Sequence, residues 1–354
     1  MIMNRLKTTF TVALLLPLLL LSACKRRPLE DGLPELARIP VHIDWSNSGI
    51  NPYSQNELEK VHWVSIRFFP KDGSPAFDRY LEEPDVTDGW INVPVGKYSV
   101  IVFNESLRDV NWEGAISFSG INEYAKFAAH AVAWNPAQWA AEFPYYTPPQ
   151  GESVIIGPAP STLAPKLASW SLDYFEVTEN MLLLSQGLLS PGDVGAADRS
   201  MLEALTHIEM HCLTRTVNVT AQVKNLVSIY ANYCALSGFA HTVFMASREK
   251  TQSPSIKLFK LNGRQYDANQ LDGTTRCSFL SFGRVPPPET YMLSVDVLYG
   301  TGELLTPKLA DFNVTNDVTV LSPGPDININ INYAVDYRDG IAVNEWQEDV
   351  LEIK

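Results

Sequence analysis

The run His207-Ile208-Glu209-Met210-His211 is the clearest candidate for metal chemistry in this sequence. Imidazole and carboxylate groups bind zinc, but the zincin motif places its glutamate directly after the first histidine, on a helix. On a β-strand, His207, Glu209 and His211 point to one face, with neighbours about 6.6 Å apart. The alternative is the polar face of an ordinary strand whose other residues face a core. We favour this alternative and predict that the protein holds no metal and no other cofactor.

Catalytic motifs of other kinds are not apparent either. No serine lies in a nucleophile elbow, no cysteine lies in a nucleophile motif, and the remaining histidines are isolated. The run Gly300-Thr301-Gly302 has the composition of a hairpin turn and not of a phosphate-binding loop. We therefore predict a protein that is not an enzyme.

Three tryptophans, Trp134, Trp139 and Trp170, could stack on sugar rings if they were exposed on one surface. The alternative is that they are aromatic residues that pack in a core or against loops, which is the usual place for large rings. We favour packing, and keep sugar binding as the second interpretation.

Cys24 is the residue with the most specific chemistry. It follows Leu21-Ser22-Ala23, which closes an apolar segment that begins after the cations Arg5 and Lys7. That segment is too short to cross a membrane core of about 30 Å, and it has the form of a secretory signal. The Leu-Ser-Ala-Cys run looks like a lipobox, so we predict signal cleavage after residue 23 and acylation of Cys24, for example with palmitate. Several acyl chains, at about 0.8 kcal/mol per buried methylene, would hold the protein on a membrane.

The remaining cysteines are Cys212, Cys234 and Cys277. Because an exported protein meets an oxidising environment, these three cysteines allow one disulfide, with three pairings open. The alternative is three reduced cysteines that pack as small apolar residues.

Composition limits the classes of partner. The formal charge is −13, and it becomes −15 when Arg5 and Lys7 leave with the signal. A body this acidic is repelled by nucleic acid, so we predict no nucleic-acid partner. The hydrophobic fraction of 45% is sufficient for packed cores, and 24 prolines favour strands and turns over long helices.

Short alternating segments along the chain predict a mainly β protein. The clearest is Asp326–Tyr333, in which isoleucines alternate with asparagines; Lys97–Asn104 is apolar on both faces and should be a central strand. Other expected strands are Ile39–Trp45, Val61–Phe69, Trp170–Val177, Thr206–Val223 as one long strand, and a last strand or strap within Ile341–Lys354. Tyr124–Trp139 is the best helical candidate, although its sequence also fits an extended conformation.

Spacing of this kind is typical of β-sandwiches. The breaker-rich stretch Gly187–Asp198 suggests a domain boundary. We expect a signal peptide at 1–23, a lipidated tether at 24–38, one sandwich at 39–190 and a second at 198–354.

Several segments together resemble a known family. These are Cys24 to Asp31, Val41 to Trp45, Phe68 to Gly73, and Val93 to Glu105. They are similar to an uncharacterised lipoprotein family of Bacteroidales that is related to fimbrillin-type pilus anchor and minor fimbrial subunits. The resemblance implies two tandem transthyretin-like (Ig-like) sandwiches and a lipid-anchored place in the outer membrane.

The function implied is structural: an anchor or minor subunit of a cell-surface pilus (fimbria), with fimbrillin-like subunits as partners in cell adhesion. The alternative is a surface lipoprotein that binds glycans or nutrients. Acidic residues directly after the lipid cysteine accompany surface export in this group, whereas Lys25-Arg26-Arg27 come first here. We expect the protein to face the cell surface, with the periplasm as the alternative.

The resemblance also implies assembly by strand complementation, in which an open sheet edge accepts a strand from a neighbour. An anchor that keeps its lipid also keeps its first strand, here Ile39–Trp45. It would then offer its C-terminal segment, Asp326–Lys354, to the next subunit. Trp346, Val350 and Ile353 are the apolar residues expected to act in this donor or strap segment.

Overall fold

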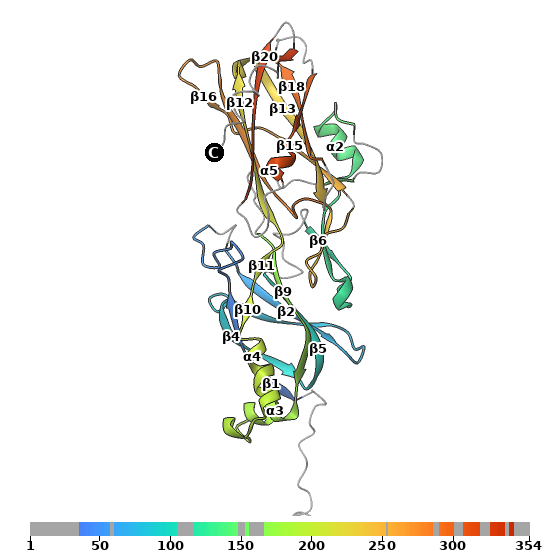
Figure 1. Cartoon of the computed structure of the whole chain (residues 1–354), viewed down its shortest axis with the longest axis vertical. Helices are drawn as coiled ribbons and strands as arrows, with labels where there is room; N and C mark the ends of the chain where they lie inside the picture. Colours follow the sequence, from blue (N-terminus) through green and yellow to red (C-terminus); the bar gives the residue numbers. More distant parts are fainter. Residues whose placement is uncertain are drawn as a thin grey trace, which may run out of the picture. The chain divides into compact units, whose positions relative to one another are not determined.

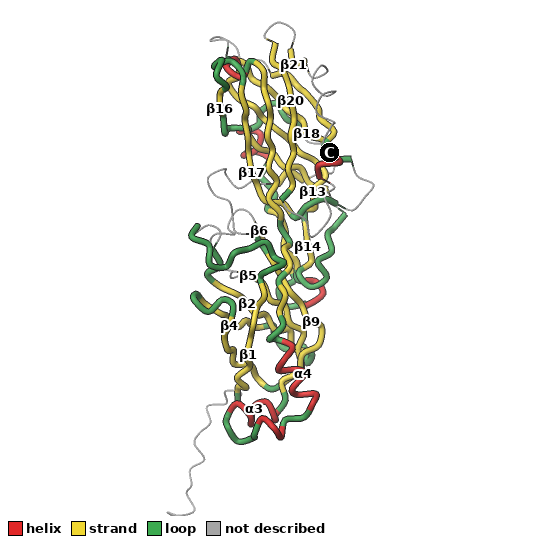
Figure 2. Tube along the Cα trace, turned by 60° about the vertical axis from the view of Figure 1, so that its left-hand side comes forward, coloured by secondary structure: helices red, strands yellow, loops and turns green. Residues whose placement is uncertain are grey.

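The computed structural model describes residues 35–56, 60–104, 116–147, 153–155, 166–252, 254–285, 290–300, 307–318, 326–336 and 340–342. Within these ranges the protein is mainly β, as the sequence predicts, and its helices are short (Figure 2). Apart from Leu36, which begins the first strand, all the elements below belong to the compact unit that starts at Ala37.

Two sheets enclose the first core (Figure 1). One sheet has the order β10-β1-β4, and the other has the order β11-β9-β5-β2-β3. The strands are β1 (Leu36–Asp44), β2 (Trp63–Pro70), β3 (Phe77–Glu82), β4 (Asp88–Pro94), β5 (Gly96–Asn104), β9 (Ala168–Val177), β10 (Ile208–Glu209) and β11 (His211–Cys212). Every strand that the sequence analysis expected between residues 39 and 104 is found here, with ends shifted by a few residues.

Strand β5 lies between β9 and β2 and is buried on both faces. Val100 and Val102 belong to the first core, whereas Ile101 and Phe103 belong to a second cluster on the opposite face. This double burial explains why both faces of the strand are apolar.

Two helices follow β9: α3 (Glu179–Ser185) and α4 (Ala196–Ala204). Thr178 caps α3, because its side chain accepts a hydrogen bond from the backbone N–H of Met181. The buried Asp198 of α4 accepts hydrogen bonds from Thr178 Oγ1 and Asn180 Nδ2, both at 3.0 Å, and so ties the two helices together. After α4, strands β10 and β11 return to the first two sheets.

A third, smaller sheet has the order β14-β7-β6. Its strands are β6 (Ile116–Ser119), β7 (Ala128–Ala131) and β14 (Thr242–Phe244), and its apolar residues join the second cluster. The helix predicted over Tyr124–Trp139 is therefore wrong. This stretch holds a short 3-10 turn (η2, Tyr124–Lys126), then β7, and only then helix α2 (Pro136–Glu142), which Asn135 caps. Pairing of β7 on both sides overrides the helical propensity of its alanines.

Two further five-stranded sheets enclose the largest core, with the orders β16-β17-β12-β20-β21 and β19-β18-β13-β15-β8. The strands are β8 (Ser153–Ile155), β12 (Arg215–Lys224), β13 (Ile229–Ala240), β15 (Pro254–Lys260), β16 (Gln265–Tyr266), β17 (Gly273–Ser281), β18 (Met292–Tyr299), β19 (Pro307–Asn313), β20 (Ile327–Asp336) and β21 (Gly340–Ala342); the short elements η3 (Pro191–Asp193), η4 (Leu226–Ser228) and α5 (Thr315–Val318) complete the described part. As predicted, Ile327, Ile329 and Ile331 are buried in β20, and Asn328 and Asn330 are exposed.

Strand β8 comes from the first half of the chain but pairs in parallel with β15, through Ser153 opposite Ser255. The sheets therefore do not follow the expected division at 190–198. Strands β10 and β11 come after it but lie in the first two sheets, and β8 comes before it but lies in the sheet of β15.

Candidate functional site

The first strand of the described chain, β1, lies in the middle of its sheet. It pairs in parallel with β10, with Ile43 opposite Ile208, and has β4 on its other side. The backbone N–H of His42 donates to Leu205 O at 2.9 Å, and that of Ile43 donates to Thr87 O at 2.8 Å. Ala37, Ile39, Val41 and Ile43 are buried in the first core. At its C-terminal end, from His42 to Asp44, β1 is therefore paired with the chain itself on both sides.

Strand β20, which opens the predicted donor segment, is likewise paired within its own sheet. It lies in parallel beside β12 and antiparallel to β21. Trp346, Val350 and Ile353 lie outside the described residues, as does Cys24.

The run His207–His211 does not form one strand face. Glu209 belongs to β10, beside β1, whereas His211 belongs to β11 and pairs with Ser169 of β9 in the other sheet. The long strand predicted over Thr206–Val223 is therefore wrong, because the chain changes sheet at the buried Met210 and again before β12. Within the described ranges, no group of three histidine, cysteine or acidic side chains is placed to hold a metal ion.

The thiols of Cys212, Cys234 and Cys277 are all free in the structure. Burial raises the pKa of each, most strongly for Cys234 in the largest core, where the neighbouring Cys277 adds to the effect. The Cys212 thiol donates to Thr214 O at 2.7 Å. These environments fit the reduced alternative, and a disulfide among the three stays a prediction.

The three singled-out tryptophans pack against cores. Trp134 and Trp139 lie against a small cluster around Phe143 and Ile256, and Trp170 lies against the first core. The more exposed aromatic pair is Trp63 with Tyr80, whose rings meet edge to face with centroids 6.5 Å apart. This pair joins neighbouring strands, and spacing in the sequence gives no signal for it.

The described part of the chain holds a polar pocket of about 650 Å³. Its lining comes from the loop 46–49 after β1, the segment 211–215 between β11 and β12, Lys166, Val243, Arg248, Lys250 and Asp326. Segments that are far apart in the sequence thus meet here.

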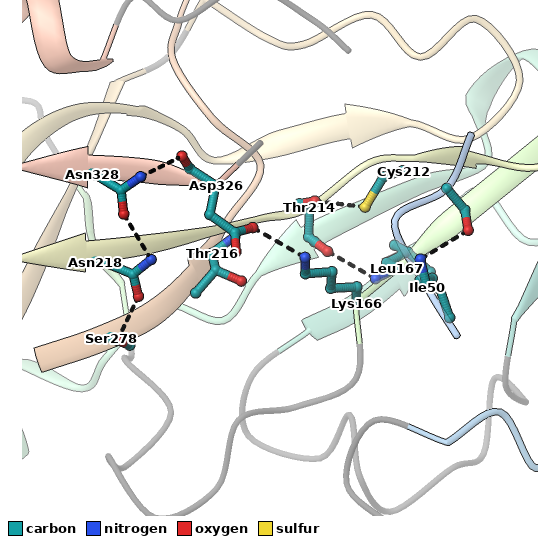
Figure 3. A network of polar contacts seen from close by, with 11 residues as sticks. Ile50, Lys166, Leu167, Cys212, Thr214, Thr216, Asn218, Ser278, Asp326 and Asn328 are labelled. Carbon is teal, nitrogen blue, oxygen red and sulfur yellow. Dashed lines mark hydrogen bonds and ion pairs between the residues drawn. The ribbon is translucent and has the colours of Figure 1, made fainter. Parts of the chain in front are cut away.

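Hydrogen bonds hold one wall of the pocket together (Figure 3). Lys166 Nζ lies 3.0 Å from Asp326 Oδ1, and the backbone N–H of Thr216 donates to the same oxygen at 3.3 Å. Thr214 Oγ1 accepts from the backbone N–H of Leu167 at 2.8 Å. Beyond Asp326, its backbone carbonyl accepts from Asn328, and Asn328 in turn accepts from Asn218.

The pocket is positively charged, although the chain as a whole is acidic. Lys166, Arg215, Arg248 and Lys250 line it, and Asp326 is the one carboxylate among the described lining residues. Burial, with Arg215 and Arg284 nearby, lowers the pKa of Lys250 to about 8. Burial and Arg248 also lower the pKa of His211. The sequence analysis missed this site, because its cations come from separate segments.

The family model described as "Domain of unknown function (DUF5119)" matches residues 23–260. The chain belongs to this family. Residues 23–260 contain the first two sheets and the small third sheet, and they end with β15.

A candidate fimbrium anchoring subunit of Bacteroides ovatus is 31% identical over 114 residues, which cover 32% of this chain and 31% of that protein. The chain thus matches about a third of the length of that relative. The resemblance seen in the sequence, to an uncharacterised family related to fimbrial anchor subunits, is confirmed.

Among solved structures, a candidate adhesin of Bacteroides ovatus aligns over 87% of this chain and 96% of its own, with 16% identity and a TM-score of 0.47. The fimbrial anchor protein of Porphyromonas gingivalis aligns over 88% of this chain and 98% of its own, with 11% identity and a TM-score of 0.38. No helix in the described ranges is long and apolar enough to span a membrane.

Proposed function

We propose that this chain is a lipid-anchored structural subunit of a cell-surface fimbria, in the anchor or a minor position, with no catalytic activity. The observation that carries this proposal is the position of β1, which is paired on both sides and buried on one face. The name of the Bacteroides ovatus relative and the signal ending at Cys24 support the same role.

Retention of β1 suits the subunit at the base of an assembly. Where a groove between two strands is empty, a neighbour's strand can fill it through main-chain hydrogen bonds. Here β1 already lies between β4 and β10, so the chain's own first strand holds the central place in this sheet. A subunit of this kind ends the fibre at that side, while acylation of Cys24 holds it on the outer membrane.

In this proposal, the residues after Ala342 donate a strand to the next subunit. Residues 327–336 are engaged with β12, so the donor or strap is confined to the region of Trp346, Val350 and Ile353. Fimbrillin-like subunits are the partners in this proposal.

Replacement of Cys24 by alanine tests the anchoring role in cells that make the fimbria. Without the acyl chains the fibre loses its attachment, so fimbriae should move from the cell fraction to the medium while subunit synthesis is unchanged. Quantitative blots of both fractions measure this. Cys212→Ala, at a cysteine remote from the signal, is the control and should leave fimbriae on the cells. Fimbriae that remain attached to cells producing the Cys24→Ala chain would refute the proposal.

Deletion of Asn344–Lys354 tests the donor segment separately. The truncated chain should reach the membrane as before but fail to carry fimbriae. Normal fimbrial attachment and length after this deletion would exclude the segment as donor without removing the anchoring role.

A further inference from the structure

Exposed leucines lie where helix α3 ends. Gly187 has a φ of +73° and stops the helix; its backbone N–H donates to Leu184 O at 3.0 Å, and that of Leu188 donates to Leu183 O at 2.8 Å. This pair of bonds is a Schellman C-cap, in which the residue after the glycine often packs against the helix. Leu188 nevertheless stays 71% exposed, and Leu183 stays 36% exposed. The cap therefore holds two leucine side chains out in water.

The beginning of β1 lies at the end of β4. Strand β4 runs antiparallel to β1, because Asp88 pairs with His42 near the end of β1, whereas Trp90, further along β4, lies under the guanidinium of Arg38 near its beginning. Val95, which directly follows β4, is exposed. An exposed apolar side chain thus lies close to the point where the described chain enters the first sheet.

The second sheet brings α3 to the same place. Gly96, the first residue of β5, lies opposite Val177, the last residue of β9, and α3 begins two residues later at Glu179. Both ribbon views show α3 and α4 at one end of the first two sheets, beside β1 (Figures 1 and 2). We call this part, with Val95, Leu183 and Leu188, the α3 end.

The chain reaches the α3 end from Cys24. Leu36, the first residue of β1, follows Cys24 by twelve residues, which span at most about 40 Å when fully extended. Because acyl chains on Cys24 would hold that residue in the bilayer, the α3 end is the part of the folded body that this tether brings nearest to lipid. Exposed apolar side chains mark protein or membrane contacts. A neighbouring subunit at this end would have to fit between the body and the bilayer, within the reach of the tether.

We propose that Leu183 and Leu188 enter the headgroup region of the membrane that holds Cys24, so that the α3 end is the face of the protein that meets lipid. The inference rests on the proposed acylation of Cys24 and adds the surface that touches the bilayer.

The charges near the α3 end indicate what kind of membrane contact this is. Lys97 Nζ lies 3.8 Å from Glu176 Oε1, and Glu179 begins α3 with an exposed carboxylate. Attraction to anionic lipids is therefore not the basis of the contact. Binding through apolar area grows with the area buried and is insensitive to salt, whereas binding through exposed charges weakens as salt rises.

Fluorescent labels on the acylated chain in phosphatidylcholine vesicles test the proposal. In a Cys212→Ala background, an environment-sensitive dye is attached to Leu188→Cys; Cys234 and Cys277 are buried and should not react. Leu271→Cys is the matched control, since Leu271 is 53% exposed in the turn before β17. We expect the emission of the dye at position 188 to shift to the blue and to be quenched by brominated acyl chains. The dye at position 271 should do neither.

Leu188→Glu, combined with the dye at Leu183→Cys, separates the lipid contact from the acyl anchor. The chain should still float with the vesicles, because its acyl chains are intact, but the blue shift at position 183 should be lost, because a carboxylate opposes entry into lipid. Its Tm should match that of the wild type, since the Leu188 side chain is mostly exposed. Raised salt should leave the signal of the dye at position 188 unchanged.

Each other result has a definite meaning. Vesicles that carry the chain but leave the dye at position 188 in water would overturn the proposal and leave the anchoring role standing. A blue shift that needs no vesicles and grows with protein concentration would assign the leucines to contact with a second copy, and a shift lost in high salt would assign the contact to charge; both contradict the proposal. A chain that does not float with vesicles would refute the anchor and this inference together.

Discussion

Lys257 is a charged residue inside the largest core. It is 2% exposed, lies opposite Leu236 in the β13–β15 pair, and places Nζ 5.2 Å from the centre of the Phe279 ring. Burial lowers its pKa from 10.5 to about 7, an effect that Cys277 partly opposes. Because an unfolded chain keeps the higher pKa, it binds more protons than the folded chain between these two pH values. Stability should therefore rise with pH across this window.

Lys257→Met should raise the free energy of unfolding at pH 7.5 by about 1–4 kcal/mol, the range found when buried ion pairs are replaced by apolar residues of similar volume. It should also reduce the slope of stability against pH between pH 7 and about 8.5, below the range where thiols ionise. Urea denaturation at several pH values measures both effects. Lys126→Met is the exposed control, and an unchanged slope in Lys257→Met would show that Lys257 is not the titrating group.

At the residue scale, the sequence could reveal chemistry only where it is local. Cys24 follows a run with the composition of a secretory signal, so its modification can be predicted from one short stretch. The pocket could not be predicted, because Lys166, Arg215 and Lys250 are tens of residues apart and meet only after the sheets form. The single strand predicted through His207–His211 was wrong for a related reason: these residues are adjacent in the sequence, but the chain changes sheet within the run.

At the scale of elements, β1 depends on backbone pairing on both sides. His42 offers a clean test, because its side chain is half exposed while its N–H donates to Leu205 O. His42→Pro removes that donor and leaves the carbonyl of Leu205 without its partner, which should cost about 1–3 kcal/mol. His42→Ala keeps the backbone bond and should stay within about 0.5 kcal/mol of the wild type. Chemical denaturation measures both variants, and equal stability would mean that this bond contributes little.

Periodicity predicted the strands well where burial is one-sided, as in β20, or two-sided, as in β5. It failed over Tyr124–Trp139, where alanine-rich composition favours a helix but pairing with β6 and β14 decides the outcome. Helices α3 and α4 were missed although Thr178 before Glu179 is a recognisable N-cap, because the glycines and prolines that separate the two helices dominate the local pattern.

At the scale of the whole molecule, the first core and the largest core share no residues. We expect them to unfold as separate cooperative units, with two transitions in calorimetry. Ile66→Ala in the first core and Ile329→Ala in the largest should each cost about 2–5 kcal/mol and lower a different transition. A single transition that both substitutions lower equally would show that the two cores unfold as one.

If the chain is exported as proposed, the central place of β1 also affects the order in which it can fold. Its partner β4 follows within about fifty residues, but β10 begins at Ile208, more than a hundred residues beyond the end of β4 at Pro94. The edge of β1 that pairs with β10 therefore stays unpaired until that distant stretch is available to fold. During this interval a strand of another protein could pair with the exposed edge of β1. A periplasmic chaperone that covers this edge would therefore be needed most before the residues of α4 are available to fold.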